Sequence, residues 1–155
     1  MSVPFLQRAI ALAIENVNSG HGGPFAALIV KDGKIIAEGA NRVTSANDPT
    51  AHAEIEAIRQ ACRVLGNFQL SGCDLYSSCE PCPMCFGALY WARPDRIFYA
   101  ATAADAAAAD FDDAFIYEEL RRPPGARRLS ITQLFHPDAL RPFQVWLSST
   151  SKKPY

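Results

Sequence analysis

The chain has 155 residues, of which 49% are hydrophobic, so it can build one domain around a packed core and does not have the composition of a disordered protein. Its 15 lysines and arginines nearly balance 16 aspartates and glutamates, which disfavours binding to nucleic acid or to an anionic membrane and favours a small neutral substrate. Five cysteines, an N-terminus without a secretory signal and the lack of an apolar run long enough to span a membrane together predict a cytoplasmic protein.

Helical periodicity, short apolar runs and turn residues divide the chain into alternating helices and strands. In chain order we expect a helix from Pro4 to near Gly20, strands over 25–30 and 35–40, a helix from about 51 to 65, a strand over 75–78, a helix over 81–91, a strand over 96–101, helices over 103–109 and 115–120, a strand over 129–134 and a helix over 138–147. This alternation predicts an α/β fold, a three-layer αβα sandwich with helices on both faces of one sheet. The pair Asp32-Gly33 is a hairpin turn signal, so we expect a mixed sheet. Residues 1–155 should form a single domain.

Two short segments carry residues suited to metal chemistry. The first is His52-Ala53-Glu54, in the first turn of the helix expected over residues 51–65, for which Asp48 or Thr50 is the candidate N-cap. The second is the run 79–85, Cys-Glu-Pro-Cys-Pro-Met-Cys. One imidazole and two thiolates give a zinc ion three protein ligands and leave the fourth tetrahedral position for water. His52, Cys82 and Cys85 are therefore the expected ligands.

The spacing within these segments indicates what the site can do. Cys82 and Cys85 share one face of a first helical turn, where the positive end of the helix favours thiolate. Glu54 follows the histidine by two residues, close enough to serve a zinc-bound water as a base. The pattern H-x-E followed by P-C-x-x-C is the signature of zinc-dependent nucleobase deaminases, in which the glutamate is a general acid/base and not a ligand. The chemistry predicted is hydrolytic deamination.

Other interpretations of these residues remain open. A lone H-x-E occurs by chance on many helices, and a lone C-x-x-C can be a redox pair or half of a structural zinc site. Cys79 could supply a fourth ligand or extend the run toward iron–sulfur ligation, although the last cysteine and proline of the ferredoxin pattern are missing. The two motifs together are far more specific than either alone, and we expect Cys79 to pack beneath the site. Cys62 and Cys73 are expected to be small buried apolar residues.

At these residues the chain resembles the cytidine deaminase-like superfamily of zinc hydrolases, and several segments narrow the resemblance to its bacterial guanine deaminase branch. Those segments are residues 22–25, Asn41, 45–54, 79–85, 90–93, 111–113 and the ending with Lys152-Lys153 and Tyr155. The resemblance runs over nearly the whole chain. It implies a mixed five-stranded sheet between helices, one zinc ion per chain, and conversion of guanine and water into xanthine and ammonia. Glu54 would be the proton shuttle.

The resemblance also implies a substrate pocket. Asn41 would hydrogen-bond the purine, Phe25 would pack on its face, and the backbone at Ala53 would help to orient it. Asp113 would read the guanine edge and assist the second proton transfer. From the residues alone, a core position for Phe25, a turn role for Asn41 and a helix cap for Asp113 are equally ordinary.

In this branch the C-terminal segment is exchanged between two subunits. The resemblance therefore implies a homodimer in which residues 136–155 cross to the partner and Tyr155 closes the partner's active site. From the sequence alone a terminal tyrosine would indicate no particular function, because chain ends are usually mobile.

Two competing functions follow from the same motifs. The first is deamination of another nucleobase or nucleoside, such as guanosine, cytosine or a tRNA adenosine. A tRNA editor should carry a basic surface, and the four arginines at 121, 122, 127 and 128 lie close to six acidic residues, so we expect no nucleic-acid partner. The second is a non-catalytic domain stabilised by zinc. Glu54 argues against it, because a structural site needs no such carboxylate.

Overall fold

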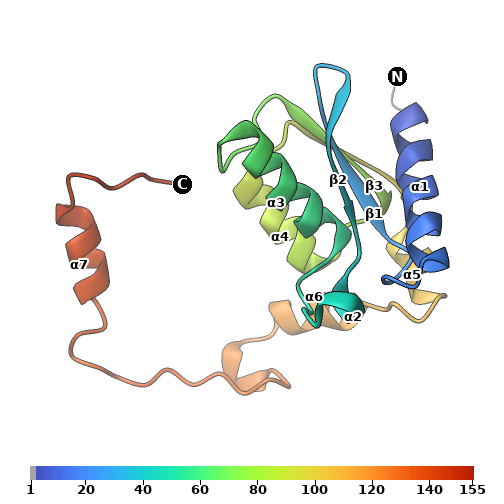
Figure 1. Ribbon diagram of the computed structural model, residues 1–155. Coiled ribbons are helices and arrows are strands. Elements are labelled where there is room, and N and C mark those ends of the chain that lie inside the picture. The colour runs from blue at the N-terminus through green and yellow to red at the C-terminus, as the bar shows by residue number, and fades with distance from the viewer. Residues whose placement is uncertain (1–2) are drawn as a thin grey trace. The chain divides into compact units, whose positions relative to one another are not determined.

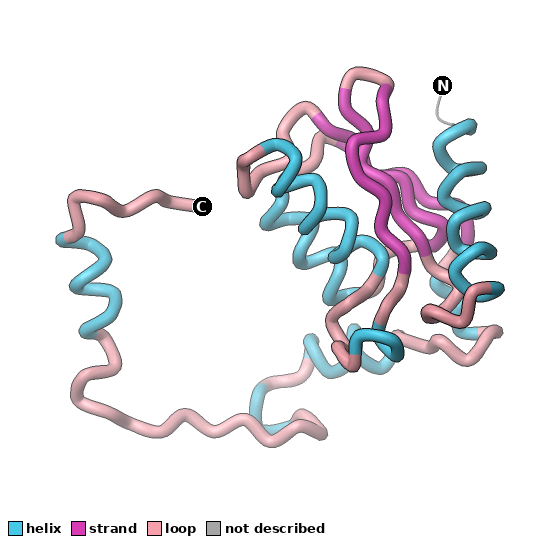
Figure 2. Tube along the Cα trace, viewed as in Figure 1, coloured by secondary structure: helices cyan, strands magenta, loops and turns pink. Residues whose placement is uncertain are grey.

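A four-stranded mixed sheet forms the centre of the first of two compact units. The computed structural model describes residues 3–155 and divides at Asp113, with residues Ala114–Tyr155 forming the second unit. The strands are β1 Ala26–Lys31, β2 Lys34–Ala40, β3 Cys73–Cys79 and β4 Arg96–Ala101, in the spatial order β2-β1-β3-β4 (Figures 1 and 2). Strand β1 runs antiparallel to β2 and β3, and β3 runs parallel to β4. The predicted mixed sheet and these four strands are confirmed.

The hairpin between β1 and β2 turns where the sequence predicts. Asp32 and Gly33 have φ values of 49° and 73°, so both residues are left-handed, as a two-residue type I′ turn requires. This turn matches the right-handed twist of the strands and pairs Lys31 with Lys34, and a register shift between Ile29 and Val30 then makes Ala26 face Ala40. The hairpin therefore brings Phe25 and Asn41, which flank it, to the same end of the sheet.

Helices cover both faces of this sheet. Helix α1, Val3–Asn18, packs on one face, where Ala9 meets Leu28 and Val30 of β1. Helices α3, Ala53–Leu65, and α4, Pro83–Ala92, cover the other face (Figure 1). The alternate β1 residues, Ala27 and Ile29, belong to the core on that side. The side chains of one strand thus serve two cores, and the predicted αβα layering is confirmed.

Short helices complete the first unit. Helix α2, Val43–Ala46, lies in the polar stretch after β2, where no helix was expected. Helix α5, Ala103–Ala107, follows β4 and starts with a capping box in which Thr102 and Asp105 bond each other's backbone N–H groups. Within the described part of the chain, no helix combines the length and apolar character needed to cross a bilayer.

The second unit is helical and irregular. It contains α6, Ala114–Arg121, a 3-10 turn, Pro124–Ala126, and α7, Arg141–Ser148, which confirms helices near 115–120 and 138–147. The strand predicted over 129–134 is wrong, and the described sheet has four strands instead of five. The segment alternates apolar and polar residues as a strand would. However, a strand is stable only beside another strand, and the described second unit contains none.

Candidate active site

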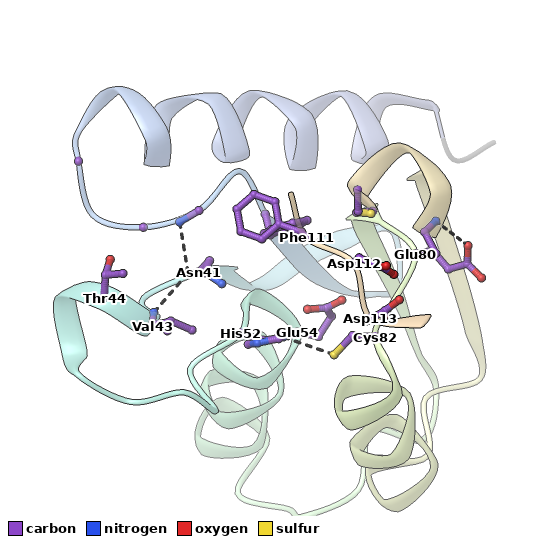
Figure 3. A pocket seen from close by; sticks show the side chains of 17 residues that line it. Asn41, Val43, Thr44, His52, Glu54, Glu80, Cys82, Phe111, Asp112 and Asp113 are labelled. Carbon is purple, nitrogen blue, oxygen red and sulfur yellow. Dashed lines mark hydrogen bonds between the residues drawn. The ribbon is translucent and has the colours of Figure 1, made fainter. Parts of the chain in front are cut away.

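The starts of α3 and α4 bring the three expected metal ligands together. His52 is the N-cap of α3, Cys82 is the N-cap of α4, and Cys85 follows in the first turn of α4. The side chains of His52 and Cys82 do not cap their own helices. They meet each other instead (Figure 3): Nδ1 of His52 lies 3.4 Å from Sγ of Cys82. The same nitrogen lies 3.5 Å from Sγ of Cys85.

Helix α3 begins later than the sequence suggested. Asp48 and Thr50 were the candidate caps, but the first helical residue is Ala53. Asp48 instead accepts hydrogen bonds on Oδ1 from the backbone N–H and the hydroxyl of Thr50, in the turn before the helix. An aspartate can satisfy backbone donors in such a turn as well as at a helix start. Because of this shift, His52 stands just outside the helix, with its backbone extended.

The donor set fits zinc. Zinc–sulfur bonds of about 2.3 Å and zinc–nitrogen bonds of about 2.0–2.1 Å at tetrahedral angles place nitrogen and sulfur ligands about 3.6 Å apart. The two nitrogen–sulfur distances at His52, 3.4 and 3.5 Å, are close to that edge length. All three ligand atoms lie within 4.8 Å of one another. Three protein ligands are the number that a catalytic zinc site uses, whereas structural sites are closed by four.

The protonation of the two thiols also suits a cation. A hydrogen bond from Cys85, helped by His52, lowers the pKa of Cys82 to about 4. The same hydrogen bond, together with burial, raises the pKa of Cys85 far above its usual range. A hydrogen bond to Cys82 raises the pKa of His52. The sulfur pair thus shares one proton and carries a negative charge, which a divalent cation stabilises while it replaces that proton.

Glu54 lies beside the ligand group as a buried carboxylate. It is only 6% exposed, and burial raises its pKa. The hydroxyl of Ser77, on β3, donates to its Oε1 at 3.5 Å. A carboxylate with a raised pKa is a stronger base than an exposed glutamate, which suits a group that accepts and returns a proton. Its position in the first turn of α3, as the sequence predicted, points its head group toward the pocket (Figure 3).

A glycine allows α3 to approach the sheet closely enough for this arrangement. A Cβ at Gly39 of β2 would lie 2.2 Å from the carbonyl oxygen of Ala53 and 2.4 Å from the amide nitrogen of Ala57. No other residue could occupy this position without moving the helix or the strand. The start of α3, and with it His52 and Glu54, is therefore held by direct backbone packing on β2.

His52, Cys82 and Glu54 lie in the wall of a pocket of about 550 Å³ (Figure 3), a size typical of small-molecule sites, and Cys85 is buried behind that wall. All of its lining residues belong to the first unit: Gly20, Gly22, Gly23, Phe25, Asn41, Val43, Thr44, His52, Glu54, Cys79, Glu80, Cys82, Ala103, Ala106, Phe111, Asp112 and Asp113. Phe25 and Phe111 meet edge to face, with ring centroids 4.9 Å apart. Phe25 also packs against the core, as one of the two predictions stated, and its contact with a purine stays a prediction.

Asn41 has a fixed amide orientation in the pocket. Its side-chain oxygen accepts hydrogen bonds from the backbone N–H groups of Gly23, at 3.3 Å, and Val43, at 3.2 Å. Because two N–H groups donate to the oxygen, the orientation of the amide is fixed, and its NH₂ group is available to donate to a ligand. Both alternatives raised by the sequence therefore apply, since Asn41 supports a turn and also lines the pocket.

Asp112 and Asp113 both reach the pocket from the segment after α5. The preceding Asp110 has a φ of 69°, a left-handed conformation that reverses the chain at the end of α5 and brings Phe111 back toward Phe25. Burial raises the pKa of the Asp113 carboxyl. Asp113 is thus a half-buried acid facing the site, whereas the sequence left open whether it was only a helix cap.

Two other residues that were expected to contact the substrate are not among those that line the pocket. Ala53 is buried, and its carbonyl oxygen faces Gly39. Tyr155 belongs to the second unit. The involvement of both residues in substrate binding stays a prediction.

The remaining cysteines behave as structural residues. Cys79 is buried and its thiol donates to the carbonyl oxygen of Thr102, so it lies outside the three-residue ligand group. Cys73 is part of the core and Cys62 packs against it. These positions agree with the predictions for Cys79 and Cys73, whereas Cys62, predicted to be buried, is only partly buried.

Phe111 and Ser77 were missed as individual site residues. The only signal for Phe111 was its place beside Asp112 and Asp113. Ser77 gave no signal at all, because its contact with Glu54 joins residues 23 positions apart.

Comparison with known proteins matches this geometry. The profile of the cytidine and deoxycytidylate deaminase zinc-binding region matches residues 3–101. Guanine deaminase from Bacillus subtilis is 60% identical to this chain over 151 residues, which is 97% of each chain. An X-ray structure of guanine deaminase from that organism aligns with 100% of this chain and 99% of its own chain, with 58% sequence identity and a TM-score of 0.99. The tRNA-specific adenosine deaminase of Agrobacterium fabrum is 50% identical over 78 residues, which is 50% of this chain and 51% of the other. The matched region contains all three ligand residues and Glu54, and the chain belongs to the cytidine and deoxycytidylate deaminase family of zinc-binding proteins.

Proposed function

We propose that this protein is a zinc-dependent aminohydrolase that converts guanine and water into xanthine and ammonia. The observation that carries the proposal is that the His52, Cys82 and Cys85 ligand group adjoins one pocket, which His52, Cys82 and the buried Glu54 carboxylate line. The similarity to guanine deaminase extends over almost the entire chain, whereas the similarity to tRNA-specific adenosine deaminase covers half of it. Guanine is therefore favoured over a tRNA adenosine, in agreement with a net charge of −1.

The reaction needs a nucleophile, a proton shuttle and a leaving ammonia. Zinc held by His52, Cys82 and Cys85 would supply a Lewis acid at which water becomes nucleophilic near neutral pH. The Glu54 carboxylate would accept one proton of the attacking water and pass it to a ring nitrogen. The second proton of that water would go to the departing amine, which leaves as ammonia. A carbon–oxygen bond forms and the carbon–nitrogen bond to the exocyclic amine breaks. Ser77, which donates to Oε1, orients the carboxylate for these transfers.

The pocket offers matching groups for a purine. The NH₂ group of Asn41 can donate to an acceptor on the base, since its oxygen is already engaged. Phe25 and Phe111 offer an aromatic wall against the ring. The Asp113 carboxylate would accept from the N–H groups along the guanine edge and assist the second proton transfer. The backbone of Ala53 would help to orient the ring at the start of α3.

We further propose a homodimer in the cytoplasm. Helix α7 carries exposed apolar side chains, Phe143, Val145, Trp146 and Leu147, which suit burial against another chain. Exchange of residues 136–155 between subunits would bury them and bring Tyr155 to the partner's active site. All five cysteines are free, which suits a reducing compartment.

A substrate panel tests the proposal. Purified protein with one zinc ion per chain is given guanine, guanosine, cytosine, adenine and cytidine separately, and ammonia release is followed. The proposal expects guanine to have the highest kcat/KM. A higher value for guanosine or for a pyrimidine would assign the pocket to another substrate, and no release from any of them would favour a non-catalytic zinc domain.

A further inference from the structure

A buried asparagine lies behind the wall of the pocket and does not line it. Asn16, in the last turns of α1, is only 6% exposed, although most residues around it on this part of the helix are exposed. Its side-chain nitrogen lies 2.9 Å from the carbonyl oxygen of Gly23 and 2.9 Å from that of Asn41. Both N–H donors of the amide are therefore used on backbone carbonyls that belong to two separate segments.

These two segments form one side of the pocket. Gly23 lies in the loop before β1, and Asn41 follows β2. The segments also bond to each other, because the N–H of Asn41 donates to the carbonyl of Phe25 and the N–H of Gly23 donates to Oδ1 of Asn41. They approach so closely that a Cβ at Gly22 would lie 2.1 Å from the carbonyl oxygen of Asn41.

This network determines how the Asn41 side chain faces a ligand. Oδ1 of Asn41 is held by Gly23 and Val43, so the NH₂ group points to the pocket only while those two N–H groups stay in place. Asn16 holds the Gly23 peptide on one side and the Asn41 peptide on the other. The Gly23 carbonyl also accepts the backbone N–H of Phe25 at 2.9 Å, so the Asn41 carbonyl is the one that depends more on Asn16.

We propose that Asn16 is a positioning residue for purine recognition: by clamping the Gly23 and Asn41 carbonyls, it fixes the Asn41 amide with its N–H donors toward the substrate. The inference rests on the proposed function, in which Asn41 contacts the base. Asn16 itself does not touch the substrate. Its removal should therefore weaken binding and leave the chemistry at Glu54 nearly intact.

Steady-state kinetics with guanine provide the first test. Asn16→Ala removes both donors, so the Asn41 carbonyl loses its side-chain partner while the Gly23 carbonyl keeps the N–H of Phe25. We expect a loss of about tenfold to hundredfold in kcat/KM, the size of one misdirected hydrogen bond to the substrate. Most of the loss should appear as a higher KM, with kcat changed by less than about threefold, because the interaction serves binding. Asn18→Ala is the matched control, since Asn18 is an exposed residue of the same helix. That variant should behave as wild type.

A double-mutant cycle separates positioning from a general structural role. If Asn16 acts through Asn41, the loss caused by Asn16→Ala should be absent when Asn41 is already alanine. Equal losses in both backgrounds would overturn the proposal. Thermal melting and zinc content are measured for each variant. If Asn16→Ala does not fold, Asn16→Ser, which is polar but lacks the NH₂ group, takes its place in the cycle.

Amide hydrogen exchange gives a readout that does not depend on catalysis. In the zinc-loaded Asn16→Ala protein, the N–H groups of Gly23 and Val43 should exchange faster than in wild type, while those of β1 and β3 stay protected. Unchanged exchange at both positions would refute the clamp even if activity falls. If the wild type does not deaminate guanine, the proposed function fails, and the exchange rates still decide whether Asn16 orders the Asn41 amide.

Discussion

Replacing Gly39 with alanine tests whether the packing of α3 on β2 sets the geometry of the active site. The new Cβ would lie 2.2 Å from the oxygen of Ala53 and 2.4 Å from the nitrogen of Ala57, and both are backbone atoms that cannot rotate away. Carbon–oxygen contacts in proteins are about 3.3 Å or longer, so the first turn of α3 has to move by about 1 Å. Overpacking of this kind costs about 1–3 kcal/mol of folding stability. For a chain of this size that corresponds to a melting temperature lower by about 2–12 °C.

The same displacement should reduce catalysis more than stability. His52 and Glu54 flank Ala53, while Cys82 and Cys85 stay on α4, so the movement separates the two halves of the site. A misplacement of about 1 Å in reacting groups can cost about a hundredfold in rate. The assays are thermal melting, zinc content per chain, and kcat/KM for guanine.

Gly87→Ala is the control for Gly39→Ala. Gly87 lies in α4, and no heavy atom would lie within 4 Å of its added Cβ. This variant should be neutral or more stable by about 0.5–1 kcal/mol, because alanine favours a helix. If Gly39→Ala melted and turned over guanine like wild type, the close approach of α3 would not be what positions His52 and Glu54.

Three further predictions concern the proposed roles. Glu54→Gln should keep one zinc ion per chain and lose about 10²–10⁴-fold in ammonia release, because general acid–base catalysis is removed and the ligands remain; wild-type turnover in that variant would exclude Glu54 as the proton shuttle. Asp113→Ala should lower kcat/KM for guanine by about tenfold or more through loss of a charged hydrogen bond, with little change in melting temperature, and a large melting shift with normal activity would indicate a capping role instead. Deletion of residues 151–155 should lower guanine turnover while zinc stays at one per chain, and unchanged kinetics would argue against a lid formed by Tyr155.

The metal centre could be predicted from the sequence because its geometry is mostly local. Cys82 and Cys85 share a helical turn, so spacing places them on one side. Glu54 follows His52 by only two residues, and it is the H-x-E motif, not helical spacing, that predicts their shared site. The four central strands were predictable for a similar reason, since short apolar runs between turn residues leave few alternatives. The predicted strand over 129–134 shows the limit of this reasoning. Alternation of apolar and polar residues is compatible with a β-strand, but the segment becomes a strand only when a neighbouring strand pairs with it.

The supporting contacts of the pocket could not be predicted because they join distant residues. Asn16 reaches Asn41 across 25 positions, and Ser77 reaches Glu54 across 23. A buried serine or asparagine has no spacing rule, and its partners are known only when the hairpin and the helices are assembled. The late start of α3 has a different cause. Asp48 could satisfy N–H groups either at a helix start or in a turn, and local sequence does not distinguish the two.

The two helices that meet at the site begin with side chains that do not cap them. A serine, threonine, aspartate or asparagine at the N-cap usually contributes about 1 kcal/mol to the stability of its helix. His52 and Cys82 occupy these positions without such a bond and face each other instead. A zinc ion bound by both residues would therefore hold the starts of α3 and α4 together. A ligand that binds only the folded state raises folding stability in proportion to the logarithm of its concentration. Zinc supply should thus govern how long the protein survives proteolysis as well as how fast it works, and a metal-depleted chain should open first at its active site.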